Sequence, residues 1–115
     1  MNSFYDNQLQ PIYKGDTATI WLKVFQDNNQ YMNFNGKTIK FIVKKSKTET
    51  DNEAIIYKTY EPTADTDIIA INFTEDETNK TPGVYLWSVR VLFQGKQGTE
   101  GEGRLEIKQG VFYGK

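Results

Sequence analysis

Carboxylates are the side chains of this sequence best suited to chemistry, and they gather in two short segments. Glu49, Asp51 and Glu53 alternate along one segment, and Asp65 and Asp67 lie in the other. Neither segment has the spacing or the central glycine of a calcium-binding loop. Two carboxylates can serve as acid and base in glycoside hydrolysis, but nothing in the sequence sets the distance between them. Because acidic side chains without partners usually lie in solvent, we interpret both segments as surface loops and predict no metal site.

Histidine and cysteine are both absent from the chain. Their absence excludes disulfide bonds, the common zinc sites and the Ser-His and Cys-His catalytic arrangements. It also removes the side chain most often used for proton transfer near neutral pH. We therefore predict that the protein is not an enzyme and needs no cofactor, with catalysis by carboxylates alone as a third and weaker alternative.

Four lysines, Lys40, Lys44, Lys45 and Lys47, form the main basic segment. Strand alternation turns Lys40 and Lys44 outward, where lysines commonly protect a sheet edge from pairing with another strand. A nucleic-acid-binding surface is the alternative, but such surfaces normally accompany an excess of basic residues, and the formal net charge here is -1. The sequence also lacks a secretory signal and an apolar run of about 18 residues. We predict binding to neither nucleic acid nor membrane.

Glycines are frequent near the end of the sequence, at Gly95, Gly98, Gly101 and Gly103. No helix and no lysine–serine/threonine signature follows them, so they do not form a phosphate-binding loop. We assign Gly95 and Gly98 to a turn. We expect Gly101 and Gly103 to mark a β-bulge or the close approach of another backbone.

Aromatic residues make up 14% of the chain, and a small core cannot bury all of them. Exposed rings anchor protein interfaces or stack on sugars. The candidate interaction surface contains seven rings: Phe4, Tyr5, Trp21, Phe25, Tyr60, Phe112 and Tyr113. We favour a protein interface, particularly for the two tails. A coplanar row of Trp21 with Tyr60 or Phe25 would instead suit a carbohydrate.

Apolar residues alternate with polar ones along most of the sequence, which predicts about seven short strands. The expected strands cover residues 10–13, 17–25, 37–45, 54–60 and 67–73 and a long hairpin at 82–108. Thr74 followed by Glu77 is a capping box, which predicts one or two helical turns near residues 75–80, ending at Pro82 and Gly83. This spacing of strands and turns is typical of a two-sheet antiparallel β-sandwich.

The alternation also predicts which side chains share a face. We expect one face of residues 54–60 to carry Ile55, Tyr57 and Thr59. The expected core residues are Ala18, Ile20, Leu22, Val24, Ile39, Phe41, Val43, Ile69, Ile71, Phe73, Tyr85, Trp87, Val89, Val91 and Phe93. The 115 residues suffice for a single domain, 1–115, with residues 1–9 as an N-terminal arm and 110–115 as a C-terminal tail.

Five motifs occur in a fixed order: LQPIYKGDT (residues 9–17), NGKTIKFIVK (35–44), TEDET (74–78), PGVYLWSV (82–89) and EGRLEI (102–107). In order and spacing they resemble the N-terminal domain of the upper baseplate protein of phages of Gram-positive bacteria. That domain is a small immunoglobulin-like module of tailed-phage structural proteins. The likeness extends over about residues 9–111.

The resemblance implies an immunoglobulin-like sandwich and a non-enzymatic structural role in a phage or prophage virion. The implied partners are other phage structural proteins of the tail or baseplate, with the domain in multiple copies or as a homo-oligomer. The implied location is the virion, after synthesis in the host cytoplasm. The baseplate protein continues past this domain whereas this sequence stops at Lys115, which implies a free-standing version on the tail, neck or head. The alternative function is a carbohydrate-binding module for adhesion to the host cell wall.

Overall fold

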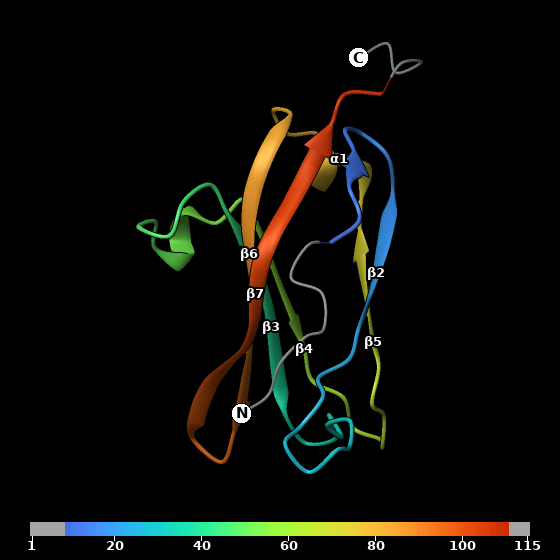
Figure 1. The fold of residues 1–115 in the computed structure, drawn as a ribbon, viewed down its shortest axis with the longest axis vertical. Helices are drawn as coiled ribbons and strands as arrows, with labels where there is room; N and C mark the ends of the chain where they lie inside the picture. The colour runs from blue at the N-terminus through green and yellow to red at the C-terminus, as the bar shows by residue number, and fades with distance from the viewer. Residues whose placement is uncertain (1–8, 111–115) are drawn as a thin grey trace.

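The computed structural model describes residues 9–110, which form an all-β sandwich of two sheets (Figure 1). The larger sheet has the order β1-β7-β6-β3-β4, and the smaller sheet pairs β2 with β5. The strands are β1 (Ile12–Tyr13), β2 (Ala18–Leu22), β3 (Thr38–Lys44), β4 (Ile56–Tyr60), β5 (Ile69–Phe73), β6 (Gly83–Phe93) and β7 (Lys96–Lys108). Two short helices, η1 (Asp51–Glu53) and α1 (Glu75–Thr78), follow β3 and β5. The predicted fold class is confirmed.

The strand connections are those of an immunoglobulin-like sandwich. β1 runs parallel to β7, with Ile12 opposite Ile107, whereas the other strand pairs are antiparallel. The hydroxyl of Tyr85, near the start of β6, donates a hydrogen bond to the backbone carbonyl of Thr81. This contact back to the preceding turn is the tyrosine corner of immunoglobulin-like folds.

The core lies between the two sheets and is built around β6. Trp87 stacks on Phe41 of β3 at a centroid distance of 6.0 Å, and Phe41 also contacts Phe73 of β5 at 5.9 Å. Gly103 stands opposite Trp87 in the β6–β7 ladder, so no side chain on that strand competes with the indole for space. Of the predicted core residues all are buried or packed against the core except Phe93.

Phe93 is 43% exposed, which corrects the prediction that it lies in the core. It is the last residue of β6, and the turn after it consists only of Gln94 and Gly95, with φ of 53° and 77°. Two residues of positive φ form the tight hairpin turn that matches strand twist. β7 therefore begins at Lys96, so Gly98 lies in the strand and not in the turn as predicted.

The expected β-bulge is present in the hairpin beside Gly101. Val89 pairs with Gly101 and Arg90 with Thr99, which leaves Glu100 as the additional residue on β7. Such a bulge bends the strand locally and increases its twist.

Of the face predicted for residues 54–60, Tyr57 and Thr59 on β4 point away from the core, whereas Ile55, just before the strand, packs against it. Val43 pairs with Ile56, and opposite residues share a face, so Ile56 and Tyr60 turn inward with Val43. Tyr57 is 43% exposed on the outer face.

The predicted capping box forms at α1. Thr74 Oγ1 accepts a hydrogen bond from the Glu77 amide at 3.2 Å, and Glu77 Oε1 accepts one from the Thr74 amide at 2.9 Å. Thr78 Oγ1 then donates to the Asp16 carbonyl at 2.7 Å, which ties α1 to the turn before β2. The short helix thus holds the connection that leads into the tyrosine corner.

Candidate interaction surfaces

The structure separates the predicted surface aromatics. Trp21 on β2 is 66% exposed, and Phe25 just beyond that strand is half-buried. Tyr60 packs against the core from β4, in the other sheet, so it forms no common row with Trp21. The other four predicted residues, Phe4, Tyr5, Phe112 and Tyr113, lie outside the described residues.

Trp21 belongs to an outward row that includes a second ring the sequence analysis missed. Trp21, Lys23 and Phe25 alternate with the buried Leu22 and Val24, so the three share the outer side of the smaller sheet. Tyr31 forms a β-bridge with Phe25, and their rings meet edge to face at 5.3 Å. Lys23 Nζ lies 4.6 Å from the centroid of the Tyr31 ring, within cation–π range. We call Trp21, Lys23, Phe25 and Tyr31 the Trp21 face.

The residues beside Trp21 leave its indole accessible. Trp21 pairs with Ala70 on β5, a side chain too small to cover it. In the next pair on the same face of the ladder, Thr19 Oγ1 donates a hydrogen bond to Asn72 Oδ1 at 2.8 Å. Within residues 9–110 the smaller sheet contains β2 and β5 alone, so each has an edge without a strand partner there. An exposed ring beside open strand edges is suited to docking another polypeptide.

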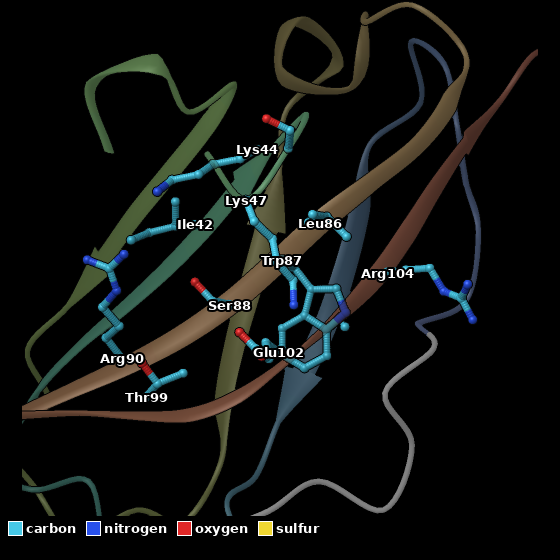
Figure 2. A pocket seen from close by; sticks show the side chains of 12 residues that line it. Ile42, Lys44, Lys47, Leu86, Trp87, Ser88, Arg90, Thr99, Glu102 and Arg104 are labelled. Atoms are coloured by element: carbon cyan, nitrogen blue, oxygen red, sulfur yellow. The ribbon is translucent and has the colours of Figure 1, made fainter. Parts of the chain in front are cut away.

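A second surface, which sequence analysis missed, is a groove of about 700 Å³ on the outer face of the larger sheet (Figure 2). Its aliphatic lining residues are Leu86 of β6, which is half-buried, and Ile42 of β3, which is 1% exposed. Ser46, Ser88 and Thr99 add hydroxyl groups. Ile42 and Leu86 were the available signal, because they put apolar side chains on the outer face of two strands whose inner faces are also apolar.

Asp51 organises the cations on one side of this groove. Arg90 donates hydrogen bonds to both carboxylate oxygens of Asp51, at 2.7 and 2.9 Å, and Lys44 Nζ lies 2.9 Å from Oδ1. Lys44 also donates to the carbonyl of Glu49 at 2.9 Å. The Arg90 hydrogen bond, then that from Lys44, lowers the pKa of Asp51 from 3.8 to about 2. The segment with η1 is therefore held on the outer face of the sheet.

Three more acidic residues of the two segments, Glu49, Glu53 and Asp65, also have structural partners, which refines the interpretation of both segments as plain surface loops. Glu49 Oε1 accepts hydrogen bonds from the amides of Lys45 and Ser46, at 2.7 and 3.2 Å. Hydrogen bonds from the Thr50 amide and hydroxyl lower the pKa of Glu53. The side-chain amides of Asn33 and Asn35 lower the pKa of Asp65 in the same way.

No cluster of three or more potential metal ligands occurs among residues 9–110.

The edge-protection interpretation of the lysines is wrong, because β3 lies between β6 and β4 inside the larger sheet. Lys44 instead pairs with Asp51, and Lys40 Nζ lies 6.0 Å from the centroid of the Tyr57 ring. In Figure 2, Lys44 and Arg90 extend toward one another, whereas Arg104 points away from them.

None of the helices in the described part of the chain has the length and apolar character needed to cross a membrane. Comparison of the chain with protein-family models, with curated proteins and with solved structures found no match.

Proposed function

We propose that this protein is a non-enzymatic structural component of a phage or prophage virion that assembles through protein–protein contacts at the tail or baseplate. The observation that carries the proposal is Trp21, which is 66% exposed on a sheet whose two strands have no further strand partner among residues 9–110. Covering this ring on docking removes apolar surface from water, a gain of about 2–3 kcal/mol. Tryptophan is also among the residues that most often dominate interface energies.

Multiple copies of the domain on a particle would make a small contact surface sufficient for this role. A single ring with a few neighbours gives a weak contact, but copies held at fixed spacing on a particle bind cooperatively through high effective concentration. The proposed partners are other phage structural proteins, with this domain in multiple copies. The protein would occur in the host cytoplasm before assembly and on the virion afterwards.

The placement of the family-like motifs is compatible with this proposal. The motifs at 9–17, 35–44 and 74–78 form the entry to β2, strand β3 and the capped helix α1. The motifs at 82–89 and 102–107 form the two halves of the β6–β7 hairpin. Each motif thus forms one strand, strand entry or helix of a single immunoglobulin-like sandwich.

Mass spectrometry of purified particles tests the proposal. Particles from a lysate that carries this reading frame should contain the polypeptide after density-gradient purification and a high-salt wash. Particles that contain the other structural proteins but lack this one would exclude the proposal.

Carbohydrate binding is the second candidate, and the observation that favours it is the pair of exposed rings, Trp21 and Tyr31, at 66% and 41% exposure. Sugars stack on such rings, and Lys23 beside Tyr31 adds a hydrogen-bond donor. Retention of the isolated protein on purified host cell walls, lost in a Trp21→Ala variant, would favour this function. A lack of retention would remove it and leave the particle role unaffected.

A further inference from the structure

The groove on the outer face of the larger sheet has the composition of a binding site and is distinct from the Trp21 face. Its volume of about 700 Å³ lies within the usual range for ligand sites. Its accessible aliphatic residue is the half-buried Leu86, next to the buried Ile42, and Ser46, Ser88 and Thr99 add hydroxyl groups. Apolar surface with a few convergent polar groups is the usual make-up of such sites.

Charge in the groove is strongly one-sided. Four cations, Lys44, Lys47, Arg90 and Arg104, line it against a single acidic lining residue, Glu102. With Asp51 included, this set has a net charge of +2, whereas the whole chain has -1. The groove is therefore a local positive region on a chain whose net charge is negative.

The internal ion pairs leave donors available. Arg90 has five N–H donors and gives two hydrogen bonds to Asp51, and Lys44 has three and uses two, for Asp51 and Glu49. Asp51 thus fixes the two cations in place without exhausting them. Within residues 9–110, no hydrogen bond or ion pair involves the side chains of Lys47 or Arg104.

We propose that this groove binds an acidic peptide segment of a partner protein, in which an aliphatic side chain is flanked by carboxylates. The aliphatic side chain would contact Leu86, the half-buried aliphatic residue of the lining, because Ile42 is only 1% exposed. The flanking carboxylates would pair with Lys47 and Arg104 and with the free donors of Lys44 and Arg90. This binding site does not depend on the virion role proposed above.

A peptide fits the groove better than a nucleic acid does. Single strands bind to sequence-tolerant proteins by stacking bases on exposed aromatic rings. The one aromatic side chain among the lining residues, Trp87, is 2% exposed and stacked on Phe41. The aliphatic groove surface and the carboxylate of Glu102 also suit a peptide more than a phosphate backbone.

A titration followed by amide chemical shifts tests the proposal. The protein is mixed with the blocked pentapeptide Glu-Asp-Leu-Asp-Glu, with its lysine counterpart Lys-Lys-Leu-Lys-Lys, and with a ten-nucleotide oligothymidylate. The acidic peptide should cause saturable shifts at Ile42, Leu86, Ser88 and Thr99, and the basic peptide none. Raising the ionic strength from about 0.05 M to about 0.3 M should weaken the binding, because screening shortens the reach of the charges.

Matched charge variants localise the effect. The double variant Lys47→Glu with Arg104→Glu should weaken acidic-peptide binding at least tenfold. The double variant Lys96→Glu with Lys108→Glu changes the net charge equally at exposed positions outside the groove, and should bind within about twofold of the original protein. Absence of saturable shifts, shifts elsewhere, or equal weakening in both variants would overturn the proposal. Tighter binding of the oligothymidylate at the same residues would replace it with a nucleic-acid site.

Discussion

Arg90 of β6 donates two parallel hydrogen bonds to Asp51 of η1, at 2.7 and 2.9 Å. The two residues are 39 positions apart in the chain. This pair fixes the segment after β3 on the outer face of the larger sheet and shapes one wall of the groove. Bidentate arginine–carboxylate pairs are among the strongest polar contacts in proteins, so this contact should be measurable both in stability and in its pH dependence.

Asp51→Asn should lower the free energy of unfolding near neutral pH by about 1 kcal/mol. The carboxylate is 36% exposed, so solvent screening reduces the value that its pKa shift implies. Since the folded-state pKa is about 2 and lies below the ordinary value of 3.8, the stabilisation is complete above about pH 4 and disappears as the pH falls through about 2. Urea unfolding at a series of pH values measures the difference.

Asp67→Asn is the control for this experiment, because Asp67 is exposed and its side chain makes no hydrogen bond or ion pair within residues 9–110. Its stability should follow that of the original protein across the same pH range. If both variants showed the same pH dependence, the Arg90–Asp51 contact would not be the cause.

Tyr85→Phe should destabilise the protein by about 1–2 kcal/mol. The substitution leaves the ring in the core but deletes the hydroxyl that donates to the Thr81 carbonyl. Tyr57→Phe removes a hydroxyl from a tyrosine that is 43% exposed, and should stay within about 0.5 kcal/mol of the original protein. Chemical denaturation of the two variants in parallel compares them. Equal small effects would show that the tyrosine corner adds nothing to stability.

Gly95→Ala should cost about 1 kcal/mol even though a Cβ there meets no atom within 4 Å. The cost comes from the backbone, because φ is +77° and residues with a side chain rarely adopt it. Gly98→Ala is the matched control within the hairpin, since its Cβ meets only the flexible end of Glu100 at 3.1 Å. That variant should change stability by less than about 0.5 kcal/mol. Thermal unfolding of both variants shows whether backbone conformation or steric space determines the stability cost of a Gly→Ala substitution in the hairpin.

The two tryptophans should respond differently to a fluorescence quencher in solution. Trp21 is 66% exposed and Trp87 is 2% exposed. Collisional quenching by iodide should therefore affect Trp21 almost alone, and Trp21→Phe should leave an emission that iodide hardly reduces. Trp21→Phe should also keep the stability within about 0.5 kcal/mol, since the ring makes little contact with the core. Strong quenching in the Trp21→Phe variant would contradict the burial of Trp87.

The sequence predicted the strands well because alternation in a half-buried strand has a period of two and can be seen without tertiary information. The alternation could not decide which side chains face inward where both of its phases are apolar. Ile55 and Ile56 are adjacent and both apolar, and the pairing of Ile56 with Val43 places Ile56 on the inner face of β4, while Ile55 packs against the core from just before the strand. Phe93 fits the alternation of β6 as well as Val91 does, but it stands at the turn where the two sheets no longer cover it.

The interaction surfaces were less predictable because they depend on contacts between distant residues. The exposure of Trp21 follows from its position on an outward face, which alternation indicates. Tyr31 joins that face only through its bridge to Phe25. The groove depends on Asp51 meeting Arg90 and Lys44, and no local pattern marks that pairing.

Co-sedimentation with purified particles tests whether Trp21 anchors the protein to the virion, if the original protein and a Trp21→Ala variant are compared in the same gradient. The original protein should be found in the particle fraction, and the folded Trp21→Ala variant should remain largely in the soluble fraction. A double variant of Lys96→Glu with Lys108→Glu serves as the surface control and should stay with the particles. Absence of the original protein from intact particles, or equal retention of the Trp21→Ala variant, would contradict the account.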